Sequence, residues 1–335
     1  MLVEFSVENY RSFKDRITFS MLASDDTTHE EANVINLDDG MRLLKSAVIY
    51  GANASGKSNL IAAMDFMSSF VYLSQERKPD EPIKVDFFAL DNSYKNKPSR
   101  FDVIFYVEDK KYAYGLALTT EAVVEEYLYR FDDGKQRTIF ERMNTTEFNF
   151  NDEYGDNPDF QILDYFRTMD ITAKNKAFLS ILVMLNFKNA MDAYKWIGDF
   201  YQYTEAVPFS ILRMGYFDTN SNKEVAEQYV EIAKEWVKRV DVGISDIRID
   251  ENKELFKDDY FNNGKYTWEN FTKIMNHVIS THEGKNDDGT CYKVDFPFFS
   301  AESYGTRMFY LASISISEKM ARGGVFIKDE LNRAC

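Results

Sequence analysis

An octapeptide at residues 51–58 constrains the fold of this chain more than any other feature of its sequence. It reads Gly-Ala-Asn-Ala-Ser-Gly-Lys-Ser and fits the pattern G-x-x-x-x-G-K-S in full. Its two glycines permit backbone angles that turn successive N–H groups inward, which makes a nest for an anion. Lys57 can reach the outer phosphates of a nucleotide, and Ser58 can supply a hydroxyl to Mg²⁺. The octapeptide therefore predicts a loop that binds phosphate.

The segments on either side of the octapeptide favour the same interpretation. Residues 47–50 form a short apolar run that predicts a strand, and apolar residues at helical spacing follow it: Leu60, Ile61, Met64, Met67 and Val71. A phosphate loop requires this order of strand, loop and helix, and the helix N-terminus adds the positive end of its dipole. A plain glycine turn before a helix is the alternative, but it has no use for Lys57. The predicted fold class is α/β, that of a P-loop nucleoside triphosphatase.

A second segment with candidate site residues lies near the end of the sequence, and it is acidic. A P-loop enzyme needs a strand that carries an acid near the magnesium ion. Residues 325–327 form an apolar run that predicts such a strand, and Asp329 and Glu330 follow it. Asp329 is predicted to hold Mg²⁺, directly or through water, and Glu330 to polarise the attacking water as a general base. An edge strand with an ordinary acidic end is the alternative, and Lys328 suits a buried central strand poorly.

A helix is predicted from Ser303 to about residue 320, directly before that acidic segment. Ser303 is a good N-cap, and Gly305 leaves the backbone open to close approach. A helix N-terminus with these two residues can receive a phosphate group. A plain capped core helix is the alternative. The position of the segment shortly before Asp329 favours the phosphate-binding interpretation.

The spacing of apolar residues divides the rest of the chain into stretches predicted as strands and stretches predicted as helices. Residues 1–20 predict two strands around a corner at residues 9–13. Four alternating runs between residues 101 and 142, separated by short polar turns, predict an antiparallel β meander. Helical spacing dominates residues 160–240, and a short helix is expected at residues 268–279. A further strand is expected at residues 292–296.

Composition limits the classes of function. The net charge is −15, so the surface as a whole opposes generic DNA binding, which needs clustered Lys and Arg. No stretch reaches 18 uncharged apolar residues, and the first residues follow a strand pattern and not that of a signal peptide. The chain has only two cysteines, Cys291 and Cys335, too few for a disulfide framework. A cytoplasmic protein with no membrane partner is therefore expected.

Four segments together resemble the AAA-type ATP/GTP phosphatases of bacterial abortive-infection systems, which are relatives of the recombination and chromosome-maintenance ABC ATPases. The segments are residues 4–13, 51–59, 302–306 and 329–333. The likeness covers both ends of the chain in the expected order, whereas residues 80–290 match only loosely. It implies an ABC-type head in which ATP is sandwiched between two subunits, with Ser303 and Gly305 as the signature motif.

The resemblance also implies a set of site residues and a division of the chain. Arg11 is expected to contact nucleotide phosphates or base, with a surface arginine beside a turn as the alternative. The expected nucleotide-binding residues are Gly51, Ala52, Asn53, Ala54, Ser55, Gly56, Lys57, Ser58, Asn59, Arg11, Ser303, Gly305 and Thr306. Within a single head, the expected parts are a P-loop core (1–80), a β lobe (81–150), a mainly helical insertion (151–290), and a signature helix with the acidic strand (291–335).

Relatives continue beyond the Asp-Glu strand with a further strand and a histidine that senses the γ-phosphate. The sequence ends at Cys335, so the chain is expected to be truncated relative to the family. The three histidines, His29, His277 and His282, precede the acidic segment, and none is assigned this switch role.

The leading hypothesis is Mg²⁺-dependent ATP hydrolysis by a homodimer of heads, with Lys57 and Glu330 as the catalytic residues. Hydrolysis would drive a conformational change toward a partner, which the resemblance suggests is a nuclease or nucleic-acid effector in phage defence. One alternative is a nucleotide-gated binding module with little or no turnover. A P-loop kinase acting on a small acceptor is another, but it leaves the segment around Ser303 unexplained.

Overall fold

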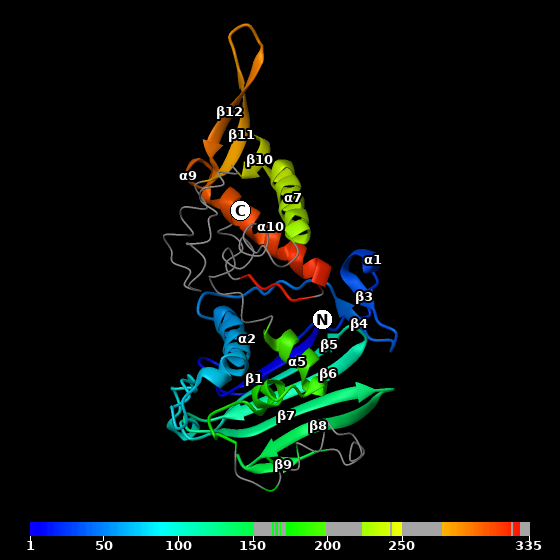
Figure 1. Ribbon diagram of the computed structural model, residues 1–335, viewed down its shortest axis with the longest axis vertical. Coiled ribbons are helices and arrows are strands. Elements are labelled where there is room, and N and C mark those ends of the chain that lie inside the picture. Colours follow the sequence, from blue (N-terminus) through cyan, green and yellow to red (C-terminus); the bar gives the residue numbers. More distant parts are fainter. Residues whose placement is uncertain are drawn as a thin grey trace. The chain divides into compact units, whose positions relative to one another are not determined.

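The computed structural model forms two compact units, each with its own core (Figure 1). The first unit comprises Met1–Gln202 and Gly323–Ile327, and the second comprises Tyr203–Arg322 and Lys328–Cys335. The structure describes residues 1–150, 163, 165–166, 168, 172–198, 223–241, 243–249, 277–322 and 324–328.

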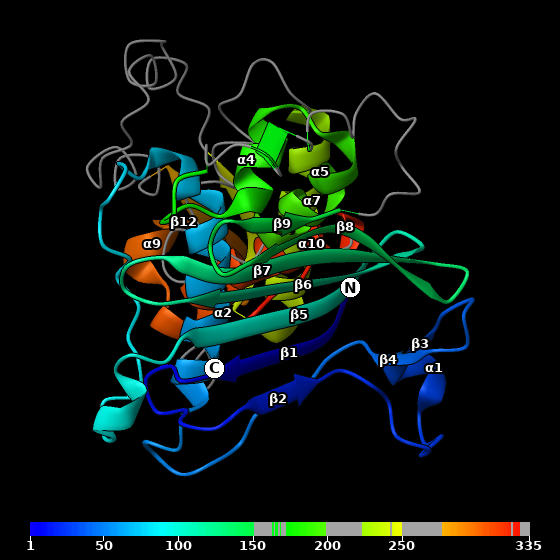
Figure 2. The same cartoon turned by 90° about the horizontal axis from the view of Figure 1, so that it is seen from below.

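A seven-stranded antiparallel sheet organises the first unit, and Figure 2 shows its strands side by side. The order is β2-β1-β5-β6-β7-β8-β9. The strands are β1 (Leu2–Glu8), β2 (Ile17–Ser20), β5 (Ser99–Val107), β6 (Lys110–Leu118), β7 (Val123–Asp132), β8 (Lys135–Met143) and β9 (Glu147–Asn149). The predicted meander is confirmed, because β5 to β8 pair in sequence order through short turns. Its two tightest turns carry left-handed residues at Glu108 and at Asp133 and Gly134.

Three helices supply the other side of the first unit's core. They are α2 (Lys57–Tyr72), α4 (Phe178–Met184) and α5 (Lys188–Gly198). Apolar residues of α2, among them Met67 and Phe70, share one core with Phe101 and Phe105 of β5. The ring of Phe105 stacks on Trp196 of α5 at 4.0 Å between centroids. This packing fixes α2, whose first two residues, Lys57 and Ser58, are also the last two of the predicted phosphate loop.

Glu126 of β7 joins the sheet to α4. Its carboxylate is buried and accepts hydrogen bonds from the backbone N–H groups of Phe178, at 2.6 Å, and Leu179, at 2.9 Å. These are orphan donors of the first helical turn, so the carboxylate takes the place of a capping residue. Tyr114 of β6 donates to the same carboxylate at 3.0 Å.

Shorter elements complete the first unit. A small sheet pairs β3 (Val34–Asn36) with β4 (Arg42–Leu44) after the short helix α1 (Glu30–Asn33). Two 3₁₀ turns, η1 (Ser74–Glu76) and η2 (Asn92–Tyr94), follow α2 and precede β5.

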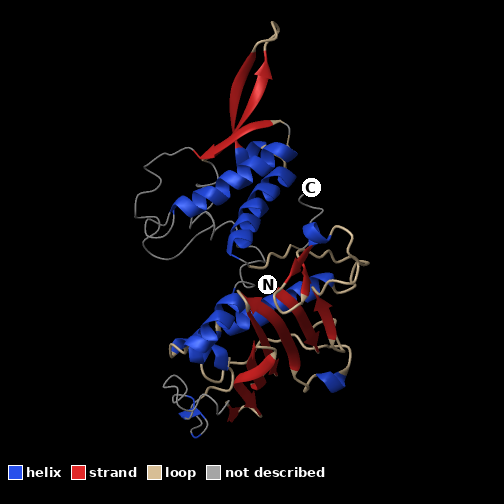
Figure 3. Cartoon of the chain, turned by 90° about the vertical axis from the view of Figure 1, so that its right-hand side faces the viewer, coloured by secondary structure: helices blue, strands red, loops and turns tan. Residues whose placement is uncertain are grey.

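The second unit packs two long helices beside a three-stranded antiparallel sheet (Figure 3). The helices are α7 (Lys223–Val240) and α10 (Tyr304–Arg322), preceded by the short α9 (Phe298–Ala301). The strands are β10 (Ile244–Ile249), β11 (Val278–Lys285) and β12 (Cys291–Pro297), in that spatial order. The core contains Val230, Ala233 and Val237 of α7 with Tyr310 and Ile314 of α10. The predicted helices over most of α7 and α10 are confirmed.

Two predicted strands are wrong. Residues 47–50 are not a strand, and Val48, Ile49 and Tyr50 are 67%, 42% and 87% exposed. Val325 and Ile327 pack against the first unit's core, but residues 324–328 form no strand either. An apolar run shows only that a segment suits burial, whereas a strand also needs a neighbour with which to form a ladder.

The predicted helix at residues 268–279 is also wrong at its end, because Val278 begins β11. Residues 268–276 lie outside the described residues, as does much of the helical stretch predicted at 160–240. Neither β10 nor β11 was predicted from the sequence, and the proposed division into four parts stays a prediction. None of the helices within the described ranges has the length and apolar character needed to cross a membrane.

Candidate functional site

The phosphate loop, residues 51–58, runs directly into the N-terminus of α2. Gly56 is the N-cap of this helix, with φ at 99°, and Ala54 is also left-handed, with φ at 64°. No side chain caps the helix, and no acidic residue lies in its first turn. The N–H groups of that turn are therefore available to an anion, with the helix dipole behind them.

Lys57 bends back over the loop. Its Nζ donates hydrogen bonds to the carbonyl oxygens of Gly51 and Ala52, both at 2.8 Å. The loop is closed by a bond from Ser55 N to the carbonyl of Ala52 at 3.2 Å. A Cβ at position 51 would lie 2.7 Å from the hydroxyl of Ser55, so that side chain would have to rotate to admit a larger residue. The loop thus folds back on itself, with the Lys57 ammonium bound to two of its carbonyl oxygens.

The corner at residues 9–13 lies beside the phosphate loop and the start of α2. Asn59, in the first turn of α2, donates to the hydroxyl of Ser12 at 2.8 Å. A Cβ at Gly56 would meet the Phe13 ring at 3.1 Å and the Ser12 hydroxyl at 3.2 Å. The corner itself is tight, since Tyr10 and Phe13 exchange backbone hydrogen bonds of 2.9 and 2.8 Å. The structure therefore brings together two segments that the sequence placed far apart.

Arg11 projects from this corner but is engaged by Asp86. Its Nε lies 3.1 Å from Asp86 Oδ2, and its backbone N donates to the Asp86 carbonyl at 2.7 Å. The Arg11 side chain is 41% exposed. Beside it, burial raises the pKa of Tyr10 to about 12, with Arg11 opposing that shift. Burial likewise raises the pKa of Asp65, whose Oδ1 has no partner among the described residues. A contact of Arg11 with nucleotide stays a prediction.

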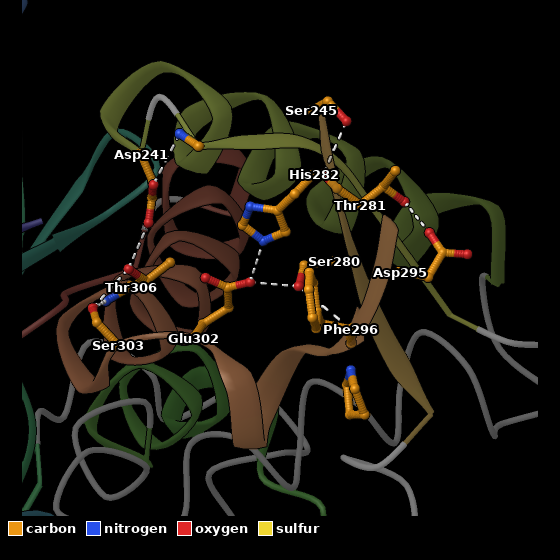
Figure 4. Close-up of polar contacts among 12 residues, drawn as sticks. Asp241, Ser245, Ser280, Thr281, His282, Asp295, Phe296, Glu302, Ser303 and Thr306 are labelled. Carbon is orange, nitrogen blue, oxygen red and sulfur yellow. Dashed lines mark hydrogen bonds and ion pairs between the residues drawn. The ribbon is translucent and has the colours of Figure 1, made fainter. Parts of the chain in front are cut away.

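The signature segment, residues 302–306, begins α10 in the second unit. Ser303 is the predicted N-cap: its hydroxyl accepts from the backbone N of Thr306 at 3.1 Å. The Thr306 hydroxyl donates to Asp241 Oδ2 at 2.8 Å and also contacts the Ser303 hydroxyl at 2.8 Å. Because the single Thr306 proton goes to Asp241, the proton between the two hydroxyls belongs to Ser303. A continuous chain therefore links Ser303, Thr306 and Asp241 (Figure 4).

Glu302, the first residue of this segment, makes contacts that sequence reasoning missed. Its carboxylate oxygen Oε1 accepts a hydrogen bond from the Ser280 hydroxyl and lies 2.7 Å from His282 Nε2 (Figure 4). Both partners belong to β11, and the three side chains come from segments about 20 residues apart. No periodicity or motif joins residue 302 to β11, so the sequence contains no signal for this cluster.

The structure describes only some of the remaining predicted site residues. Ser58 lies exposed in the first turn of α2, and Gly305 lies in the first turn of α10. Asp329 and Glu330 lie outside the described residues, so their predicted metal-binding and catalytic roles stay predictions. Within the described ranges, no group of three or more His, Cys, Asp or Glu side chains could hold a metal ion. Among the described residues the Ser58 hydroxyl is the candidate magnesium ligand, and phosphate binding by the loop stays a prediction.

Comparison with known proteins gives one family. A family model described as "AAA domain, putative AbiEii toxin, Type IV TA system" matches residues 46–332, which include both the phosphate loop and the signature segment. A comparison with curated proteins gives no match.

Proposed function

Because the chain belongs to this AAA-domain family, and so to the P-loop nucleoside triphosphatases of the α/β class, we propose that it binds ATP with Mg²⁺ at residues 51–58 and hydrolyses it. One observation carries the proposal: the uncapped N-terminus of α2 and the ammonium of Lys57 converge on the same loop. Uncapped helix donors and a lysine at one point are the arrangement that holds a nucleotide's phosphates.

We assign a separate role in binding or hydrolysis to each group of residues. The N–H groups of residues 56–58 would bond phosphate oxygens, and the Lys57 ammonium would leave the carbonyls of Gly51 and Ala52 to bind the outer phosphates. Ser58 supplies a hydroxyl to Mg²⁺, and Mg²⁺ when bound neutralises phosphate charge. Asp329 is proposed as the second magnesium ligand, and Glu330 as the base that takes a proton from water.

The finer part of the proposal is a homodimer of ABC-type heads. Ser303, Gly305 and Thr306 would then contact phosphate that is held by a second copy of the chain. The position of these residues at the start of α10 supports this role, since a helix N-terminus offers N–H groups to an anion. Nucleotide turnover would open and close the pair and so act on a partner, which we propose to be a nuclease or nucleic-acid effector in phage defence.

Titration calorimetry with a non-hydrolysable ATP analogue and Mg²⁺ tests the proposal. We expect binding by the wild type and loss of most of it in Lys57→Ala, because the ammonium is the loop's one side-chain cation. Lys135→Ala is the matched control, since this exposed lysine is the first residue of β8 and lies outside the phosphate loop. The proposal fails if the wild type binds no analogue, or if Lys57→Ala and Lys135→Ala bind it equally well.

A nucleotide-gated binding module with little turnover is the second candidate. It is favoured by the observation that residues 324–328, which precede the acidic pair, form no strand. A base that hydrolyses ATP must be held in place, and in a P-loop enzyme the end of a strand usually holds it. Phosphate release by Glu330→Gln decides between the two candidates. Release that falls well below the wild type supports hydrolysis, whereas equal release with intact ATP binding supports the binding module.

A further inference from the structure

The side chain of Glu302 is almost fully enclosed, although the residue lies in the short connection between α9 and α10. Its side chain is 9% exposed, and Ser280 and His282 both contact Oε1. Residues 280 and 282 are two apart on β11, so their side chains lie on the same face of the strand. The strand therefore presents two polar groups to one oxygen, and Figure 4 shows both directed at Glu302.

Two other contacts fix the same turn of α10. Thr306 is bonded to Asp241, the residue that follows α7, and Arg307 donates through Nη1 to the carbonyl of Phe299 in α9 at 2.5 Å. The backbone N of Glu302 also donates to the Phe298 carbonyl at 3.1 Å. The signature segment is thus held from β11, from the end of α7 and from α9. Among these contacts of the described residues, the side chain of Glu302 is the one that reaches the three-stranded sheet.

The cluster has the residue types of a nucleophilic triad but not the order that such a triad needs. A serine nucleophile must lie beside its histidine base, which a carboxylate orients from the far side. In this protein the carboxylate lies between the other two, because Ser280 donates to the same oxygen that His282 contacts. The arrangement is therefore an anchor for Glu302 and not a hydrolytic site.

We propose that Glu302 is a positioning residue: its carboxylate, held by Ser280 and His282, fixes Ser303 and the first turn of α10 for phosphate bound to a second copy of the chain. The inference rests on the proposed function, in which this turn meets the second copy's nucleotide. Residue 303 follows directly on the anchor, so release of Glu302 lets the Ser303 N-cap and the N–H groups behind it shift. A displacement of about 1 Å is enough to weaken a phosphate contact severely.

Three variants and two measurements test the inference. Glu302→Ala removes the anchor, Glu302→Gln keeps an oxygen that can accept from Ser280 and from a His282 N–H, and Asp295→Asn is the control. Asp295 lies on β12 of the same sheet and bonds to Arg248 and Thr281 but not to Glu302. Calorimetry measures binding of the ATP analogue with Mg²⁺, and sedimentation measures self-association with that analogue.

We expect Glu302→Ala to bind the analogue within about twofold of the wild type, because the phosphate loop contains no part of the anchor. Self-association with the analogue should weaken on the order of tenfold, as loss of a charge-assisted hydrogen bond predicts. Glu302→Gln should restore most of the association, and Asp295→Asn should match the wild type.

Different results would point to different failures. A wild type that binds the analogue but does not associate overturns the proposed head pairing, and the role of Glu302 with it. A wild type that associates, with Glu302→Ala equal to it, overturns the positioning role alone. Equal losses in Glu302→Ala and Asp295→Asn also overturn it, because they would reflect the stability of the sheet. If Glu302→Ala does not fold, His282→Ala tests the same link, with a smaller loss expected because Ser280 remains.

Discussion

Asn59 donates a hydrogen bond to the hydroxyl of Ser12 at 2.8 Å, and this bond joins the first turn of α2 to the corner after β1. The corner is in turn held by the sheet, since β1 pairs with both β2 and β5. The helix that would carry the phosphates is therefore braced against the sheet at its N-terminal end. This relationship connects nucleotide binding to the stability of the first unit.

Removing this brace should weaken nucleotide binding. We expect Asn59→Ala to lower affinity for the ATP analogue by roughly three- to tenfold, because one net hydrogen bond contributes about 1 kcal/mol. Calorimetry measures the effect. Asn92→Ala, at an exposed position in η2, is the matched control and should bind as the wild type does. Equal affinity of the two variants would contradict a bracing role for Asn59.

Gly56→Ala should unfold more easily than the wild type and lose the phosphate site. The residue has φ at +99°, and an added Cβ would meet the Phe13 ring at 3.1 Å and the Ser12 hydroxyl at 3.2 Å. Left-handed strain alone costs about 1–3 kcal/mol, and the crowding adds to it. Gly40→Ala separates the two effects, because Gly40 has φ at +83° with nothing within 4 Å of an added Cβ. Denaturant melts should show a larger loss at position 56 than at position 40, and the reverse order would be evidence against crowding.

The buried cap at Glu126 should be a main support of the first unit. Glu126→Ala leaves the N–H groups of Phe178 and Leu179 and the hydroxyl of Tyr114 without their acceptor. We expect a loss of about 2–4 kcal/mol in the free energy of unfolding, since each buried unsatisfied group costs about 1–3 kcal/mol. Chemical denaturation measures it. Glu121→Ala, at an exposed position before β7, should change stability by less than about 0.5 kcal/mol.

The Arg248–Asp295 pair should make the second unit's sheet sensitive to acid. Hydrogen bonds from Arg248 and then Thr281 lower the pKa of Asp295 from 3.8 to about 2. A lowered pKa means that the folded state favours the carboxylate, so this contribution to stability is present above about pH 4 and is lost as the pH falls toward 2. NMR titration of the Asp295 carboxyl should find this low pKa, and Arg248→Gln should return it toward 3.8.

Arg16→Gln provides the comparison for that titration. Arg16 pairs with Asp102 at 2.8 Å in the first unit, so its loss should leave the pKa of Asp295 unchanged. An Asp295 pKa near 3.8 in the wild type would contradict the pairing with Arg248.

The sequence predicted those features that local patterns encode. The alternation of Phe101, Val103 and Phe105 and the turns after each run were enough to predict the meander, because neighbouring strands in a meander are also neighbours in sequence. The loop and its helix followed from the octapeptide in the same way. The family was predicted from four short segments and is confirmed by the match over residues 46–332.

Features that depend on distant partners could not be predicted. Residues 47–50 and 325–327 are apolar, but no local pattern shows whether a strand is available to pair with either segment. The contact between Glu302 and His282 joins residues 20 apart through the fold of β11 against α10, with no motif to indicate it. β10 was missed for a similar reason, because it pairs with β11 across a long intervening stretch of chain.

Among the described residues, the contacts that secure the phosphate loop lie at its helix end. Met67 and Phe70 fix α2 in the core, whereas residues 47–50 approach the loop exposed and without backbone hydrogen bonds to other described residues. A ligand that closes the loop must therefore also immobilise the chain that leads into it, at roughly 1–2 kcal/mol per residue ordered. This loss of conformational entropy would offset much of the favourable enthalpy of nucleotide binding. Amide hydrogen exchange should accordingly slow most at residues 47–55, upstream of the helix and not within it.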